Sequence, residues 1–168
     1  MNSEALLFAG IDAPECIQFG KLPRSREYFF SKAAPGQLIS HWLRHQLVIE
    51  TRHQLCQRRR LLRALGTFIG RVHATGFIHG NLSPDNVLAA LHHERFRFTL
   101  IGNEHNSRKT PPSGKMLLRN LMELSSMPSV DLSQTDHMRF FCAWRQQMKS
   151  LSPVEAKILA AEVYQRTR

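Results

Sequence analysis

The sequence has 168 residues, of which 42% are hydrophobic, and it carries a formal net charge of +10 at pH 7. This length supports one hydrophobic core and is too short for two domains of ordinary size, so we expect a single compact unit. The positive charge favours acidic partners such as phosphates, anionic lipid head groups or nucleic acid, without choosing among them.

The cysteines and the N-terminal segment indicate the compartment. Cys16, Cys56 and Cys142 are odd in number, far apart and without a C-x-x-C pair, which argues against both a disulfide framework and a thiolate zinc site. The N-terminal segment carries Glu4 and only a brief apolar run, so it matches neither a signal peptide nor a membrane span. We therefore expect a cytoplasmic protein.

The first two elements are predicted to be a hairpin and a long helix. Residues 15–36 contain two short runs of aromatic and β-compatible residues around a polar, proline-containing connection, which indicates a β-hairpin. Pro35 and Gly36 end it, and residues 38–65 are then basic and free of both Gly and Pro. We expect this stretch to be helical.

The expected helix has one apolar and one basic face. Its apolar face is formed by residues spaced three or four apart, namely Leu61, Leu65, Phe68 and Val72. Its outer face is expected to carry four arginines, Arg58, Arg59, Arg60 and Arg63. Such a cluster is either a solvated face or a binding patch. Arg59, Arg60 and Arg63 are the candidate anion-binding residues, because positions 59 and 63 lie four residues apart on one helical face.

The second half of the chain reads as short strands followed by helices. Residues 95–100 alternate polar and apolar side chains, and this period of two predicts a strand. Residues 77–80 and 86–91 are also expected to be extended. Towards the C-terminus, Ser152 and Glu155 form a capping-box start, with an apolar stripe behind it made of Val154, Ile158 and Leu159. The aromatic residues expected in the core are Phe140, Phe141 and Trp144.

Residues 79–86, with the sequence HGNLSPDN, resemble the catalytic loop of a protein-kinase-like fold. In that pattern, His-x-Asp-x-x-x-x-Asn, the Asp accepts or orients the proton of the substrate hydroxyl and the Asn holds a magnesium ion. His79, Asn81 and Asn86 occupy the three places. A long amphipathic helix before the motif and a short strand after it fit the same context.

Four segments resemble the bacterial lipopolysaccharide kinases, which phosphorylate Kdo or heptose sugars of the inner core. They are HGNLSPDNVL, FTLIGNE, RNLMELSS from Arg119 to Ser126, and DHMRFFCAW from Asp136 to Trp144. The resemblance covers roughly the whole chain and is clearest from the hinge-like SKAAPGQ onward. It implies an α+β fold, in which residues 37–168 form a mostly helical kinase-like C-terminal lobe. Residues 1–36 would then be a remnant hairpin of the N-lobe with the hinge.

The family resemblance implies ATP and magnesium as cofactors, and a sugar hydroxyl of the lipopolysaccharide precursor as acceptor. Two residues depart from it. Asn81 stands in place of the catalytic Asp, and a carboxamide cannot take up a proton near neutral pH. Gly102 stands in place of the main magnesium ligand and leaves Asn86, a neutral donor, as the metal contact of the motif. Glu104 is either a substitute ligand or an exposed loop carboxylate.

A third departure lies ahead of the hinge. About three dozen residues precede it, and they contain no G-x-G-x-x-G. Lys21 and Lys32 lie in a turn and beside the hinge, away from the position of the phosphate-binding lysine. Either the gene has lost its N-lobe, or Met1 is an internal start. We therefore expect a pseudokinase with impaired or no phosphoryl transfer.

Other interpretations remain open for the singled-out residues. His79 could brace the loop as a core residue, and Asn86 could cap a turn. His41 and His45 have the spacing of a helical metal pair but no evident third ligand, which favours a solvated face.

Two other functions remain open for the whole chain. It could be a non-catalytic module that binds anionic glycolipid, an anionic surface of the inner membrane, or a partner enzyme through the basic helix. Nucleic acid is an unlikely partner because no reading motif accompanies the charge. The sequence does not indicate an oligomeric state.

Overall fold

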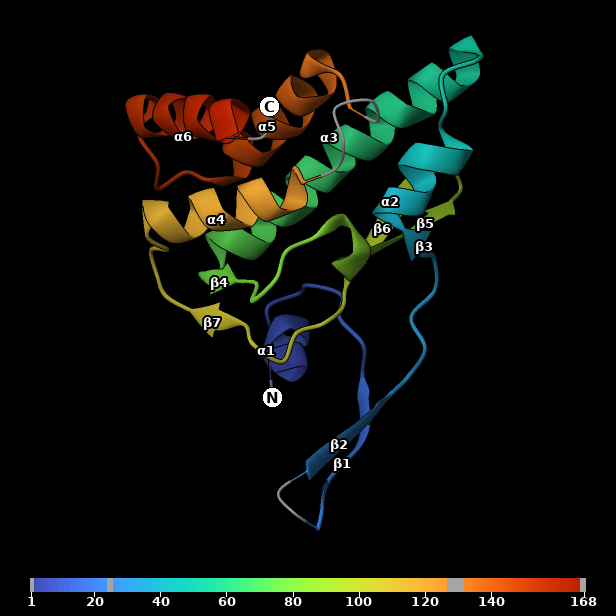
Figure 1. Cartoon of the computed structure of the whole chain (residues 1–168), viewed down its shortest axis with the longest axis vertical. Coiled ribbons are helices and arrows are strands. Elements are labelled where there is room, and N and C mark those ends of the chain that lie inside the picture. Colours follow the sequence, from blue (N-terminus) through green and yellow to red (C-terminus); the bar gives the residue numbers. More distant parts are fainter. Residues whose placement is uncertain (1, 24–25, 127–131, 167–168) are drawn as a thin grey trace.

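The computed structural model describes residues 2–23, 26–126 and 132–166. Its architecture is α+β, with α3 to α6 gathered at the top of the view in Figure 1 and α1 and the small antiparallel sheets below or beside them. The helical elements are α1 (Asn2–Phe8), α2 (Ile39–His41), a π-helical turn (Trp42–Gln46), α3 (Arg52–Ala74), a 3-10 turn (Pro84–Asn86), α4 (Gly114–Leu124), α5 (Gln134–Gln147) and α6 (Pro153–Arg166). In the described part of the chain, none of these helices has the length and apolarity needed to cross a bilayer.

Among the described residues, the strands form three antiparallel sheets. They are β1 (Cys16–Leu22) with β2 (Arg26–Ser31), β3 (Gln37–Leu38) with β5 (Val87–His92) and β6 (Arg95–Leu100), and β4 (Phe77–Ile78) with β7 (Ser107–Arg108). The β1–β2 hairpin extends away from the helices in Figure 1. The hairpin expected within residues 15–36 and the strand expected at 95–100 are both confirmed.

The long helix starts later than the sequence predicts. Residues 38–65 were expected to be continuously helical, but α2 and the π-helical turn end at Gln46 and α3 begins at Arg52. Thr51 causes this second start: its hydroxyl accepts from the Gln54 amide at 3.2 Å, and the Gln54 side chain accepts from the Thr51 amide at 2.9 Å. This capping box satisfies amides that a helix start leaves without partners.

α3 contains two glycines at the places where α5 packs closest against it, because any larger residue there would collide with α5. A Cβ atom on Gly70 would lie 2.7 Å from the Trp144 carbonyl oxygen, and one on Gly66 would collide with the Phe140 carbonyl. The apolar face predicted for the helix is confirmed, since its four residues are all buried, namely Leu61, Leu65, Phe68 and Val72. Trp144 is fully buried, while Phe140 and Phe141 pack on the core at its edge.

α6 begins at the predicted capping box but buries a different face. The Ser152 amide donates to Glu155 Oε2 at 2.8 Å, as the sequence indicated. The predicted stripe is wrong for Val154 and Ile158, which are 65% and 55% exposed. α6 packs mainly against α4, and it buries Ala156 and Leu159.

Candidate functional site

The site is built around the loop that runs from β4 to β5, and His79 is the residue that braces it. His79 is fully buried, and its Nε2 lies 2.9 Å from the Ile101 carbonyl oxygen at the end of β6. The Asn81 amide donates to His79 Nδ1 at 3.1 Å, so Nε2 carries the ring proton. Burial lowers the pKa of His79. The side chain is thus a neutral structural link between two loops.

Asn81 and Asn86 face each other across this loop. The Asn86 side-chain amide donates to the Asn81 carbonyl oxygen at 2.8 Å, which closes the turn between them. Asn81 itself is exposed, so its carboxamide is open to a substrate from the solvent side. Asp85 accepts a hydrogen bond from the Ser40 hydroxyl, which ties this carboxylate to α2. The motif therefore keeps its shape, with an amide at the position where a proton acceptor is needed.

The structure places Gly102 next to Asn86. Gly102 has φ +70°, and a Cβ atom built on it would lie 3.1 Å from Asn86 Oδ1. A carboxylate at position 102 could therefore bind the same metal ion as Asn86. Glycine offers no ligand, and the Glu104 side chain is exposed in the following loop.

These residues do not fit a magnesium ion. Magnesium sites use carboxylates together with phosphate oxygens and water, whereas positions 81, 86 and 102 supply two carboxamides and a glycine. Across the described residues, no three His, Cys, Asp or Glu side chains gather in a way that could hold a metal. His41 and His45 lie beside each other, with ring centroids 4.9 Å apart and ring planes tilted by 47°.

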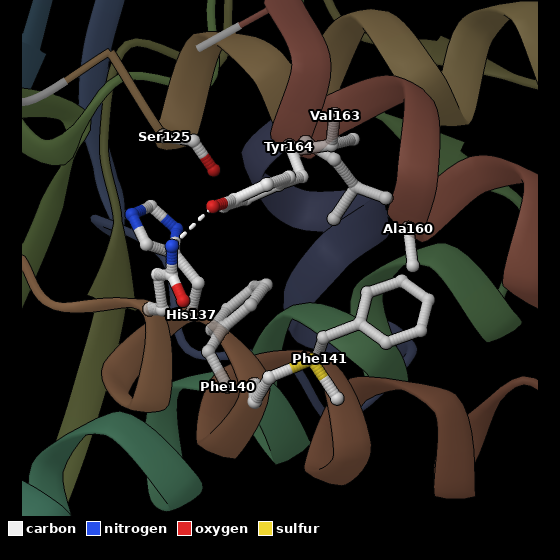
Figure 2. A pocket seen from close by; sticks show the side chains of 10 residues that line it. Ser125, His137, Phe140, Phe141, Ala160, Val163 and Tyr164 are labelled. Carbon is white, nitrogen blue, oxygen red and sulfur yellow. Dashed lines mark hydrogen bonds between the residues drawn. The ribbon is translucent and has the colours of Figure 1, made fainter. Parts of the chain in front are cut away.

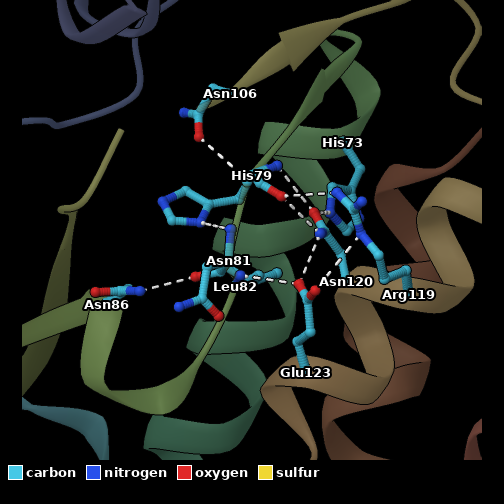
Figure 3. A network of polar contacts seen from close by, with 10 residues as sticks. His73, His79, Asn81, Leu82, Asn86, Asn106, Arg119, Asn120 and Glu123 are labelled. Carbon is cyan, nitrogen blue, oxygen red and sulfur yellow. Dashed lines mark hydrogen bonds and ion pairs between the residues drawn. The ribbon is translucent and has the colours of Figure 1, made fainter. Parts of the chain in front are cut away.

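α4 holds the loop in place through two polar residues (Figure 3). Asn120 Oδ1 accepts from the His79 amide at 2.9 Å, and its Nδ2 donates to the His79 carbonyl oxygen at 2.8 Å. Glu123 Oε2 accepts from the Leu82 amide at 3.0 Å and from Asn120 Nδ2 at 3.1 Å. The family resemblance covers residues 119–126 but implies no role for Asn120 or Glu123. The available signal was two polar side chains on the face of α4 that buries Leu117, Leu121 and Leu124.

The network continues from Asn120 into the core. His73 Nε2 lies 3.3 Å from Asn120 Oδ1, and the Trp144 indole N–H donates to His73 Nδ1 at 3.0 Å. Burial lowers the pKa of His73 to about 4. A chain of hydrogen bonds therefore connects α5, α3 and α4 to the loop.

The N-terminal helix holds the other side of the site. The Asn2 side chain donates to the carbonyl oxygens of Asn103 and Glu104 at 2.8 and 3.1 Å. The Asn106 side chain accepts from the Gly80 amide at 3.1 Å. Residues 103–106 are thus fixed to both α1 and the loop, and Leu6 of α1 is buried in the main core.

The basic cluster of α3 is not arranged as predicted. Arg58 was expected on the outer face, but it is 5% exposed and its Nε donates to Asp136 at 3.1 Å. Arg60 reaches the β5–β6 turn, where it pairs with Glu94 at 2.8 Å. Arg63 is exposed. The outer-face prediction is therefore wrong for Arg58, while Arg60 and Arg63 are both exposed.

An apolar cavity of about 270 Å³ lies apart from this loop, between α4, α5 and α6 (Figure 2). Phe140, Phe141 and Val163 line it, and the Gln134 side chain donates to the Tyr164 hydroxyl at its edge. His137 lines the same cavity, and burial lowers its pKa. The cavity accounts for why Phe140 and Phe141 are only partly buried.

Comparisons with known proteins agree with the motif. The model of the lipopolysaccharide kinase (Kdo/WaaP) family matches residues 37–144. A solved structure described as WaaP in complex with acyl carrier protein superposes with a TM-score of 0.75 at 16% sequence identity, over 98% of this chain and 71% of that chain. A comparison with curated proteins finds no match. The fold is therefore kinase-like, and the chain belongs to the lipopolysaccharide kinase (Kdo/WaaP) family.

Proposed function

We propose that this chain is a pseudokinase of the lipopolysaccharide kinase family, with impaired or no transfer of phosphate to an inner-core sugar. The observation that carries the proposal is the position of Gly102 beside Asn86. A Cβ atom built on Gly102 would lie 3.1 Å from Asn86 Oδ1, so a side chain here would be next to Asn86, but glycine supplies no metal ligand. Asn81 adds to it, because its carboxamide cannot act as a proton acceptor near neutral pH. Phosphoryl transfer depends on positioning and charge stabilisation, and both substitutions remove charge at the centre of the site.

Under this proposal, residues 37–168 form a C-lobe and residues 1–36 precede it. The family match begins at residue 37, which supports residues 37–168 as the kinase-like C-lobe. Within residues 1–36, the β1–β2 hairpin is then the remnant of the N-lobe, and it pairs with no other strand of the described chain, whereas α1 packs into the main core. Family members use ATP in general, but the phosphate-gripping lysine and glycine-rich loop have no counterpart in this sequence.

ATP is therefore expected to bind weakly and to gain little from magnesium. Thermal unfolding of the protein with ATP, measured with and without magnesium, checks this, because stabilisation rises with the ratio of ligand concentration to dissociation constant. We expect the same small shift in melting temperature in both conditions. The Gly102→Asp variant, which restores a carboxylate next to Asn86, is the matched comparison. A large shift in the unchanged protein that requires magnesium would refute the proposal.

A second candidate is a non-catalytic module that docks on an anionic glycolipid or on a partner protein. Arg63 favours it, since this exposed side chain has no ion pair with any described residue, in a protein of net charge +10. The solved relative was determined together with acyl carrier protein, so binding of a protein partner is a second form of this candidate. Such docking would place a cytoplasmic protein at the periphery of the inner membrane.

A further inference from the structure

A cleft of about 480 Å³ lies beside the seam between α3 and α5, away from the loop of residues 79–86. The two helices run close together because of Gly66 and Gly70. Each contributes polar residues to the cleft. The residues that line it are Arg63, Thr67, Met138, Arg139, Cys142, Ala143 and Gln146.

The cleft is electropositive. Arg63 and Arg139 are both in its wall, and none of the described residues that line it is acidic. Arg139 Nη1 contacts Asp136 at 3.0 Å, but that carboxylate also neutralises the buried Arg58. One carboxylate therefore faces two guanidinium groups, and Arg63 adds a third positive charge. Guanidinium groups bind phosphate through charge-assisted, bidentate hydrogen bonds.

We propose that this cleft binds a phosphomonoester or diphosphate group, held between Arg63 and Arg139 with Gln146 at its side. The inference deepens the docking candidate and rests on it, because it names the surface where an anionic ligand would bind. It keeps Arg63 from the trio of Arg59, Arg60 and Arg63 and adds Arg139 of α5, while Arg60 is paired with Glu94. The phosphate could be carried by a lipid head group or by a free phosphorylated sugar.

Cys142 provides a direct reporter of the cleft. It is an exposed free thiol in the cleft wall, and the other cysteines are Cys16 and Cys56. In a Cys16→Ser/Cys56→Ser background, the rate of Cys142 alkylation by iodoacetamide is measured against added pyrophosphate. We expect pyrophosphate to slow alkylation severalfold, and added salt to weaken this protection through screening.

Two variants separate a built site from general charge. Arg63→Gln is expected to raise the pyrophosphate concentration needed for protection by about tenfold, as the loss of one charge-assisted contact implies. Arg97→Gln removes the same charge from an exposed position on β6 and should leave the pyrophosphate concentration needed for protection unchanged. Equal effects of the two variants would overturn the proposal. A rate of Cys142 alkylation that pyrophosphate does not change at low salt would also overturn it.

Vesicles distinguish the two sources of phosphate. Binding to vesicles of phosphatidylcholine and phosphatidic acid is followed by sedimentation, together with Cys142 alkylation. Vesicle binding that protects Cys142 supports the cleft and a lipid source. Vesicle binding without protection refutes the cleft and leaves the docking candidate in place. Protection by pyrophosphate without vesicle binding supports the cleft with a free phosphorylated ligand and counts against docking on a glycolipid.

Discussion

Replacing Asp136 with Ala is expected to lower the free energy of unfolding by about 3–5 kcal/mol, the cost of leaving a buried charge without its partner. Asp136 is 2% exposed and accepts from Arg58 Nε at 3.1 Å. Arg58 is 5% exposed, and its Nη1 also donates to the Leu47 carbonyl oxygen at 3.2 Å. Asp136 further caps the start of α5 by accepting from the Ser133 amide at 3.3 Å. The substitution would remove the ion pair and the cap together.

Urea unfolding followed by circular dichroism at pH 7 measures this loss. The matched control is Glu94→Gln, which breaks the exposed pair with Arg60 and should cost less than about 1 kcal/mol. The double variant Arg58→Met/Asp136→Leu is expected to recover most of the stability, because apolar residues of similar size can replace a buried pair. A cost for Asp136→Ala no greater than that for Glu94→Gln would contradict the account.

Acid is expected to destabilise the fold through His73. Its pKa is lowered from 6.5 to about 4 by burial. The unfolded chain therefore takes up this proton at a higher pH than the folded chain, and the free energy of unfolding falls as the pH falls from 6.5 to about 4. At about 1.4 kcal/mol per pKa unit, the loss over the window is about 3 kcal/mol. The geometry agrees, since the Trp144 indole N–H already points at His73 Nδ1.

Urea unfolding at pH 7 and pH 5 tests this linkage. The unchanged protein should lose about 2 kcal/mol more than His73→Gln between these pH values. His53→Gln, at an exposed position of α3, is the matched control and should keep the full pH dependence. The lowered pKa values of His79 and His137 give losses of the same sign, so both variants retain part of the slope. If His73→Gln and His53→Gln show the same slope, His73 is not the group responsible.

The sequence predicts those elements that depend on residues close to one another along the chain. The alternation in residues 95–100, the capping box at Ser152 and the apolar face of α3 depend on neighbours a few residues apart, and the structure confirms all three. The start of α3 was missed although its signal was local. Thr51 and Gln54 have the spacing of a capping box, but the absence of Gly and Pro from residues 38–65 predicts one continuous helix.

The parts that sequence reasoning missed depend on contacts across the fold. Arg58 looks like a surface residue until α5 brings Asp136 to it, 78 residues further along the chain. Asn120 and Glu123 acquire their role from the backbone of His79 and Leu82, which only the folded chain places beside α4. The motif positions were predictable because a short loop fixes their spacing. Their supports were not, because partners for buried polar groups come from distant segments.

The most direct test of the pseudokinase proposal is transfer of labelled phosphate from ATP to an inner-core sugar acceptor in the presence of magnesium. The unchanged protein and the Asn81→Asp/Gly102→Asp variant are compared. Asp tolerates the positive φ at position 102 better than most residues, so the variant should fold. The account predicts no transfer by either protein, since restored carboxylates still lack the lysine and the loop that grip the phosphates. Magnesium-dependent transfer by the unchanged protein would contradict it.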